Sequence, residues 1–366
     1  MDKNGVRWVH RKIGDDDIYY ERKSRTMYRG TLSHKINTEK EIVDLSSSDP
    51  RAPLKVYFDP SYYCNLNCRH CITNSSVHAD TSNQLPTKRI ITIMDELATI
   101  GVLELSVGGG EPLCYSDLYS ILKHMVALGF NVVLDTNGVL VTSSIATSLA
   151  DIGLSEIRIS FEGCEQVNDS IRGQGVYKKA LQAVKILTYV GLTIVPRLTL
   201  CIGSELGLDQ LFKDLVFAGA KVIKVSTVKR AGRASLPENQ NLLGYPININ
   251  TVISLQELGK KYGIEVLFPV YFPVSPKETD GGELRYGNHM NCGAGFETAY
   301  ISPYGEIHPC SSMPQVNFGI LTSMSFMDAW TSKIANDYRH LASNCACFQL
   351  CTMKDVHILN NTGIAK

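Results

Sequence analysis

Three cysteines near residue 65 have a spacing that suits a metal centre. Cys64, Cys68 and Cys71 follow the pattern Cys-x3-Cys-x2-Cys, so one short loop brings three thiolates close together. Structural zinc is bound by four protein ligands, whereas a cluster iron without a protein thiolate is open to a chelating cofactor or substrate. Three ligands therefore favour an iron–sulfur cluster. The alternative is a zinc site that His70 or a distant residue completes.

The chain holds eleven cysteines in total, and five of them lie in its C-terminal part. These five are Cys292, Cys310, Cys345, Cys347 and Cys351. The first dozen residues carry charge but no apolar run, so a secretory signal is not supported and we expect a reducing, cytoplasmic location. In such a compartment cysteines more often bind metals or act in catalysis than form disulfides, and an odd number fits a closed disulfide framework poorly.

The composition of the 366 residues indicates a folded protein with a small or weakly charged partner. Apolar residues make up 44% and charged residues 20%, which excludes intrinsic disorder. The 36 Lys and Arg balance the 36 Asp and Glu, so the electrostatic signature of a nucleic-acid or anionic-membrane binder is missing. The longest apolar candidate, residues 266–274, contains two prolines, so no membrane span is expected. Kinase, metalloprotease and hydrolase motifs are absent.

A regular alternation of helix-like and strand-like segments begins at residue 54. Six times a helix-like stretch ends at a glycine, which tolerates the left-handed conformation at helix C-termini, and an apolar, β-branched run follows. The six glycines are Gly101, Gly129, Gly153, Gly191, Gly219 and Gly263. With residues 54–59 as the opening strand, the repeat length is roughly thirty residues, as in parallel βα units. The pattern predicts an α/β fold, either a closed or partial β/α barrel or a doubly wound open sheet.

In both architectures ligands bind at the carboxyl ends of the strands, where this chain has unusual loops. The cysteine loop follows the first strand, GGGEPLC the second, TNG the third and FEGC the fourth, and the fifth ends in LTLCIGSE. After about residue 285 the repeat stops. We therefore predict an appendage over residues 1–50 with a hairpin across residues 18–32, a barrel over 51–284 and a cysteine-rich module over 285–366.

Together these features resemble the radical S-adenosylmethionine (radical SAM) superfamily, whose signature is a three-cysteine loop after the first strand of a partial (β/α)6 barrel. Gly109, Gly110, Glu111 and Pro112 match the family's GGEP motif, which implies that they hold the amino group of SAM. A carboxylate beside an ammonium group is electrostatically favourable. Without the cysteine loop, the same residues would indicate only a tight glycine turn before a capped helix.

The resemblance implies further contacts to SAM from the other strand ends. His70 precedes the third cysteine, where relatives place a side chain near the adenine, and Thr136 and Asn137 follow the third strand. The remaining candidates are Ser160, Glu162, Arg172, Arg197 and Arg233. Glu162 stands where relatives have Asp, and Asn168 where they have His, which leaves the roles in that stretch open. Each contact has an alternative explanation. His70 could face solvent, Thr136 and Asn137 could belong to a simple Asn-Gly turn, and Arg197 and Arg233 could form ordinary salt bridges.

The C-terminal module resembles the SPASM and twitch extensions of one branch of the superfamily, which bind auxiliary iron–sulfur clusters. The first motif of these extensions is matched by Cys292 and by Gly305, which Cys310 follows five residues later. Residues 300–309 are expected to form a hairpin. An amphipathic stretch over 325–341 precedes the last three cysteines. The full SPASM motif has more cysteines at this end. Two clusters would need seven or eight thiolates, so we predict one auxiliary cluster, of the [4Fe-4S] type.

Two further cysteines, Cys164 and Cys201, lie at or just past the ends of strands. Strand alternation points Cys201 to the same face as Arg197. A thiol there could give a hydrogen atom to a substrate radical, as a cysteine does in radical SAM epimerases, so both are candidate catalytic residues. The alternative is that they pack as small hydrophobic side chains, which is also our interpretation of Cys114.

The resemblance implies an enzyme that binds SAM at the open iron of a [4Fe-4S] cluster and cleaves it reductively to a 5′-deoxyadenosyl radical, which abstracts a substrate hydrogen. An electron donor such as flavodoxin or ferredoxin is implied as a partner. The expected substrate is a ribosomally made peptide that is crosslinked or epimerised, although the residues before the barrel are too few for the winged-helix leader-binding domain of many peptide maturases. The alternatives are oxidation, epimerisation or decarboxylation of a sugar or other small metabolite, and a non-catalytic iron–sulfur or zinc protein.

Overall fold

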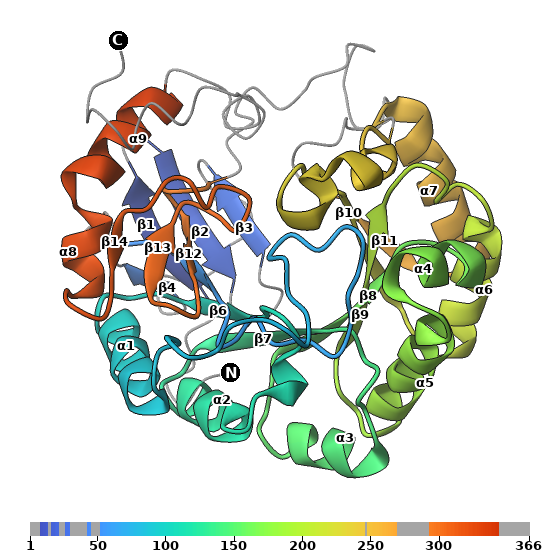
Figure 1. The fold of residues 1–366 in the computed structure, drawn as a ribbon, viewed down its shortest axis with the longest axis horizontal. Coiled ribbons are helices and arrows are strands. Elements are labelled where there is room, and N and C mark those ends of the chain that lie inside the picture. Colours follow the sequence, from blue (N-terminus) through green and yellow to red (C-terminus); the bar gives the residue numbers. More distant parts are fainter. Residues whose placement is uncertain are drawn as a thin grey trace.

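Figure 1 shows the computed structural model of the chain. It describes the backbone of four N-terminal strands and of residue 343 and, with side chains, residues 52–245, 247–268 and 293–342. Ten of the described strands form one sheet, in the order β11-β10-β9-β8-β7-β6-β5-β12-β13-β14. Its strands β5 to β11 are Lys55–Phe58, Glu104–Val107, Asn131–Thr136, Glu156–Phe161, Ile194–Leu200, Val222–Thr227 and Glu265–Leu267.

The strands from β5 to β11 are parallel, and their order in the sheet follows their order in the chain. A doubly wound sheet would reverse this order at a switch point, so the doubly wound alternative is wrong and the partial β/α barrel is confirmed. The helices α1 to α7 cover the outer face of the curved sheet (Figure 1). They are Thr87–Thr99, Leu118–Ala127, Ser143–Ala150, Glu165–Arg172, Val176–Tyr189, Leu208–Phe217 and Ile249–Tyr262.

The helix boundaries follow local sequence signals. All six glycines at the expected helix ends have positive φ, between 68° for Gly263 and 97° for Gly219, so this part of the prediction is confirmed. Gly263 is itself the C-cap of α7. At the other end of that helix the side chain of Asn248 accepts a hydrogen bond from the Thr251 amide, and Thr142 caps α3 in the same way.

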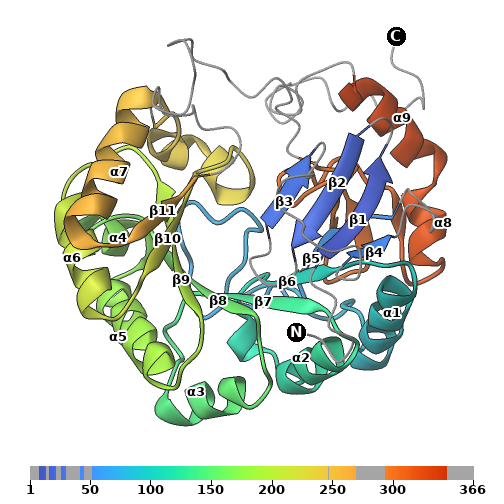
Figure 2. The same cartoon turned by 180° about the vertical axis from the view of Figure 1, so that it is seen from behind.

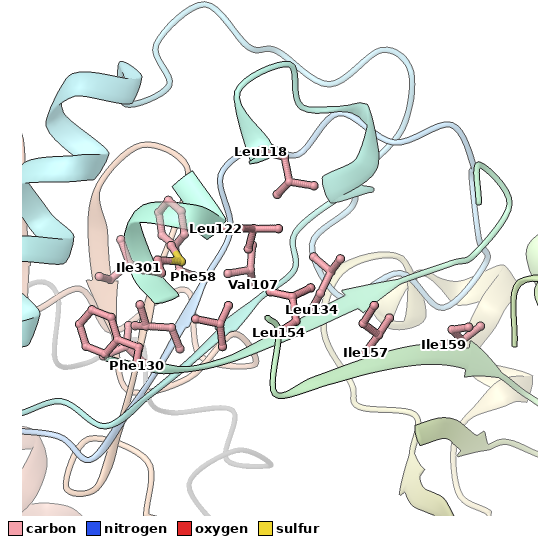
Figure 3. Close-up of a cluster of buried hydrophobic side chains, with 14 of the residues drawn as sticks. Phe58, Val107, Leu118, Leu122, Phe130, Leu134, Leu154, Ile157, Ile159 and Ile301 are labelled. Atoms are coloured by element: carbon pink, nitrogen blue, oxygen red, sulfur yellow. The ribbon is translucent and has the colours of Figure 1, made fainter. Parts of the chain in front are cut away.

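Alternation along the strands separates an apolar core from a polar barrel interior. On β8, the fully buried Ile157 and Ile159 belong to the hydrophobic core, whereas the intervening Arg158 reaches Ser106 on β6. Figure 3 shows the apolar side, where Leu118 and Leu122 of α2 lie over residues of the sheet. The sheet residues labelled there include Phe58, Val107, Leu134, Ile157, Ile159 and Ile301. The core thus fixes the strands from outside and leaves their inner face to polar residues.

The C-terminal part continues the barrel sheet. β12 (Thr298–Ile301) pairs in parallel with β5, and β13 (Glu306–His308) returns antiparallel to β12 and pairs with β14 (Gly319–Ile320). The expected hairpin over residues 300–309 is therefore confirmed. Helices α8 (Phe326–Trp330) and α9 (Lys333–Ser343) follow and bury Trp330 and Tyr338 against Phe318. This agrees with the amphipathic stretch expected over 325–341.

The four N-terminal strands form a separate sheet in the order β3-β2-β1-β4. They are Trp8–Ile13 (β1), Asp16–Glu21 (β2), Thr26–Arg29 (β3) and Ile42–Asp44 (β4). The antiparallel pairing of β2 with β3 confirms the hairpin expected across residues 18–32. Figure 2 shows this sheet in blue on the half of the molecule that carries α8 and α9. The boundaries at residues 50 and 284 stay predictions. No described helix is both long and apolar enough to cross a lipid bilayer.

Candidate active site

A cavity of about 290 Å³ lies at the carboxyl ends of the barrel strands, where the sequence predicts ligand binding. Most of the candidate residues lie on its wall. These are Cys64, Cys68, His70, Cys71, Gly109, Gly110, Thr136, Asn137, Ser160, Arg172, Arg197 and Arg233. Glu111 and Glu162 are buried directly behind this wall, and Tyr300 and Ser311 of the C-terminal part close one side of it. The cavity is therefore shared by the barrel and the module that follows it.

The three cysteines of the loop after β5 are free thiols that line this cavity. Main-chain amides point at two of them, from Leu66 to Cys64 Sγ at 3.4 Å and from Ser75 to Cys71 Sγ at 3.3 Å. Burial raises the pKa of the Cys64 thiol to about 12, so an ionised thiolate there requires a cationic partner such as a metal.

Glycines allow the loop after β6 to lie against the cysteine loop. The Gly110 amide donates to the Ser61 carbonyl and the Glu111 amide to the Tyr63 carbonyl, both at 2.9 Å. A Cβ atom at Gly110 would lie 2.1 Å from the Tyr63 carbonyl oxygen, which is closer than any real contact. The GGEP segment is thus locked to the cysteine loop through main-chain atoms that only glycine leaves accessible.

The buried carboxylate of Glu111 binds residues at the ends of two strands. Its Oε1 accepts hydrogen bonds from the Thr136 hydroxyl at 2.7 Å and the Leu113 amide at 3.1 Å, and its Oε2 accepts one from the Asn137 amide at 2.8 Å. Burial raises the pKa of Glu111, and these donors oppose the rise. The carboxylate therefore joins the loops after β6 and β7, which both supply wall residues.

A buried triad of Glu162, Arg172 and His70 lies beside the cysteines. Glu162 accepts hydrogen bonds from Arg172 through both oxygens, and His70 Nε2 lies 2.9 Å from its Oε1. Although burial opposes it, the charge of Arg172 together with His70 lowers the pKa of Glu162 to about 2. Arg172 also points Nη1 at Cys68 Sγ, 4.0 Å away. A fixed positive charge thus lies beside one of the three thiols.

Comparison with protein families decides what kind of site this is. The radical SAM superfamily profile matches residues 59–205, and that of the SPASM iron–sulfur cluster-binding domain matches residues 292–353. The chain belongs to the radical SAM superfamily. It is an enzyme of the SPASM branch, and the family's cofactors are SAM, a [4Fe-4S] cluster and auxiliary iron–sulfur clusters in the SPASM domain.

Three proteins illustrate the similarity. The mycofactocin maturase MftC of Mycobacterium tuberculosis is 26% identical over 302 residues, which cover 81% of this chain and 75% of that protein. The AdoMet-dependent heme synthase of Methanosarcina barkeri is 26% identical over 292 residues, 76% of this chain and 82% of that protein. Streptococcus suis SuiB bound to its precursor peptide SuiA shares the fold, with a TM-score of 0.69, 16% identity and coverage of 92% and 90%.

The residues on the cavity wall fit the radical SAM cofactors. Cys64, Cys68 and Cys71 would hold the cluster, which supplies the electron that cleaves SAM when both are bound. Beside them, His70 Nδ1 is buried and has no hydrogen-bond partner among the described residues. An unpaired polar atom on a cavity wall is costly unless a ligand pairs with it, which suits the expected contact with the adenine.

For two of the arginines the structure adds detail to the expected contact with SAM. Arg233 donates from Nε to the Cys68 carbonyl at 2.7 Å and from Nη2 to the Ser75 carbonyl at 2.8 Å. Its Nη1 also donates to Asn74 Oδ1 at 3.4 Å, so Arg233 holds the cysteine loop in place while it lines the cavity. Arg197 lies on the wall with Nη1 3.6 Å from Asp135 Oδ1. Contacts of both residues with SAM stay predictions.

The candidate catalytic cysteines lie off the cavity wall. Cys201 is fully buried just past the end of β9, with Sγ 3.2 Å from the Ser204 hydroxyl, and packs with Ile171 and Leu242. The chain turns after Leu200, so the strand alternation that pointed Cys201 toward Arg197 does not extend to it. Cys164 is the N-cap residue of α4 and also lies outside the cavity lining. The geometry gives neither thiol access to a substrate in this cavity.

The predicted ligands of the auxiliary cluster are only partly described. Cys310 follows β13 and has a free thiol. Cys292, Cys345, Cys347 and Cys351 lie outside the described residues. Their role as ligands stays a prediction.

The cavity residues that were not predicted from the sequence include Asp59, Asp135 and Tyr300. Each of the three lies in or next to a strand and has apolar neighbours in the sequence. A polar residue at such a position, facing the barrel interior, was the signal that could have identified them. The sequence does not reveal that Asp59 and Tyr300 meet, because β12 joins the sheet beside β5 only in the folded protein.

Proposed function

We propose that this radical SAM enzyme modifies a peptide, by crosslinking or epimerising it. The observation that carries the proposal is the single cavity that the cysteine loop, the GGEP segment and the SPASM residues Tyr300 and Ser311 line together. A substrate in this cavity lies within reach of both the site of radical formation and the module that holds the auxiliary cluster. Such a site suits reactions that remove a hydrogen atom and then an electron.

The names of the relatives support a peptide as the substrate class. MftC is a maturase by name, and SuiB has been crystallised with a precursor peptide. A second candidate is the oxidation or decarboxylation of a small metabolite, which the equally similar heme synthase favours. A non-catalytic iron–sulfur protein does not account for the GGEP segment, which packs on the cysteine loop through main-chain hydrogen bonds.

The proposal includes the partners of the reaction. We expect a cytoplasmic enzyme that receives electrons from a flavodoxin or ferredoxin. Its SPASM domain would hold one auxiliary [4Fe-4S] cluster, with Cys310 among the ligands.

The test is co-expression with the short peptide reading frames that neighbour the gene, followed by mass spectrometry of the purified peptides. A crosslink removes the mass of two hydrogens, and an epimerisation in D2O replaces one hydrogen by deuterium without other change. Either result should depend on the intact cysteine loop, so Cys68→Ala is the control.

Peptides that stay unmodified with the wild-type enzyme would contradict the proposal. If the same preparation consumes a small metabolite from the cell extract in a SAM-dependent reaction, the second candidate replaces it.

A further inference from the structure

Asp59 follows the last residue of β5 and lies on the cavity wall. Its amide donates to the Ile301 carbonyl of β12 at 3.1 Å, which fixes the main chain at this point. Its Oδ2 accepts a hydrogen bond from the Tyr300 hydroxyl at 2.7 Å. The Tyr300 hydroxyl in turn lies 2.6 Å from that of Tyr62. One carboxylate oxygen is therefore held by a tyrosine of the SPASM part.

The other carboxylate oxygen of Asp59 is open toward the cavity. Within the described part of the chain, Oδ1 makes no hydrogen bond, and Asp59 takes part in no ion pair. The residue is 6% exposed and lines the cavity, so this oxygen is accessible to a molecule bound there.

The surroundings of Asp59 raise its pKa to about 7. Burial is the largest cause, the hydrogen bond from Tyr300 opposes it, and the negative charge of Asp135 on β7 adds to it. Asp135 lies in the same cavity, and although burial opposes it, the charges of Arg158 and Arg197 lower its pKa and keep it ionised. Two carboxylates of one cavity thus differ in proton affinity, and only Asp59 can exchange a proton near neutral pH.

Net oxidation of a peptide by radical chemistry requires a group that takes up a proton. The substrate loses a hydrogen atom to the 5′-deoxyadenosyl radical, and the resulting carbon radical bonds to a neighbouring group X–H. For the new C–X bond to be stable, X–H must lose its proton and one electron must leave. An oxidised auxiliary iron–sulfur cluster held by the SPASM domain would supply the electron acceptor, so the proton still needs an acceptor among the protein's own residues.

We propose that Asp59 is the catalytic base of this step, that its Oδ1 takes the proton from X–H, and that Tyr300 is a positioning residue that holds Oδ2 and turns Oδ1 to the substrate. The inference rests on the proposed function and narrows it to net-oxidising modifications. The structure supports it through the cavity position of Asp59, the open oxygen and the absence of a pairing cation among the described residues.

The first experiment measures how SAM cleavage is coupled to peptide modification. The probe is the peptide that the wild type modifies, and the readout is the ratio of oxidised peptide to 5′-deoxyadenosine. For Asp59→Asn the ratio should fall by ~100-fold, which is the usual contribution of a general base, and Asp59→Glu should restore part of it. In the wild type the ratio should rise with pH through a midpoint near 7, because the base must be ionised.

Tyr300→Phe tests the positioning role. Losing its hydrogen bond to Oδ2 should raise the pKa of Asp59 and move the midpoint of the ratio to higher pH. Tyr304→Phe is the matched control, since its hydroxyl bonds the Asp80 carbonyl on the exposed surface, and it should leave the midpoint in place.

Two results would overturn the proposal. One is an unchanged ratio in Asp59→Asn. The other is a proportional loss of 5′-deoxyadenosine and product together with weaker SAM binding, which would place Asp59 in the SAM site.

A second experiment is independent of the substrate. In protein labelled with 13C at the aspartate carboxyl carbon and lacking the clusters, the signal that Asp59→Asn removes should titrate near pH 7. A midpoint near pH 4 overturns the proposal. If the wild type modifies no peptide, the proposed function fails, and this titration still decides whether Asp59 can act as the base.

Discussion

Single residues in the cavity region owe their chemistry to their immediate partners. Glu162 and Asp59 are both buried carboxylates, yet among the described residues Glu162 is bonded to Arg172 and His70 and the Asp59 carboxylate only to Tyr300. The charge of Arg172 lowers the pKa of Glu162, while burial without a cation raises that of Asp59. The side chain types can be read from the sequence, but these partners cannot, because they come from elements far apart in the chain.

Glu162→Gln should destabilise the protein. The substitution leaves Arg172 as a buried, uncompensated charge, which costs about 3–5 kcal/mol. The free energy of unfolding, measured by urea denaturation of the cluster-free protein, should fall by this order. Glu165→Gln, at the exposed ion pair with Lys178, is the matched control and should change it by less than about 1 kcal/mol.

The pH dependence of stability should change in the same variant. In the wild type, folding lowers the pKa of Glu162 from 4.5 to about 2, so its contribution is present above about pH 4.5 and is lost as the pH falls toward 2. Glu162→Gln should lack this component of acid destabilisation. If the free energy of unfolding falls equally in the two proteins below pH 4.5, the Glu162 carboxylate is not bonded as the structure shows.

Cys201→Ala tests whether the thiol donates hydrogen or packs. Because the side chain is fully buried beside Ile171 and Leu242, we expect a loss of about 1–2 kcal/mol in unfolding free energy and an unchanged ratio of product to 5′-deoxyadenosine. An enzyme that still forms 5′-deoxyadenosine but no product would instead establish the hydrogen-donor role and require the loop after β9 to move.

The loops at the strand ends are the elements on which the site depends. The six helix-ending glycines and the order of motifs along the chain could be predicted, because each is a local signal. The packing of one loop on another could not. Arg233 reaches the cysteine loop across 165 residues, and a Cβ atom at Gly232 would lie 2.2 Å from the Cys71 carbonyl oxygen.

Gly110→Ala should disrupt the cysteine loop. Its Cβ atom would collide with the Tyr63 main chain, so the loop must shift and we expect less bound iron after reconstitution and loss of 5′-deoxyadenosine formation. Gly108→Ala, where the nearest atom to a Cβ lies 3.4 Å away, is the matched control for iron content. Equal iron content in the two variants would mean that the loop tolerates the shift.

At the scale of the whole molecule, the SPASM part and the barrel form one sheet. β12 lies beside β5 in parallel, so the strand that precedes the cysteine loop is also the strand that carries the neighbouring module. The sequence indicated both modules and their order, but not this shared sheet, because strands at 55–58 and 298–301 have no local signal for each other. The consequence is one cavity with walls from both.

The number of clusters follows from the cysteines that remain outside the first loop. Replacing Cys64, Cys68 and Cys71 together by Ala should leave about four irons per chain, held by the C-terminal cysteines. Iron analysis and absorption spectra of the reconstituted triple variant check this. About eight irons would establish a second auxiliary cluster, and none would mean that the C-terminal cysteines do not bind iron.

Reductive cleavage of SAM tests the account most directly. Anaerobically reconstituted protein with SAM and a low-potential reductant should release 5′-deoxyadenosine and methionine in equal amounts, and Cys68→Ala should release neither. Equal yields from wild type and variant, or a colourless zinc-bound protein that does not bind SAM, would contradict the assignment of the cavity as a radical SAM site.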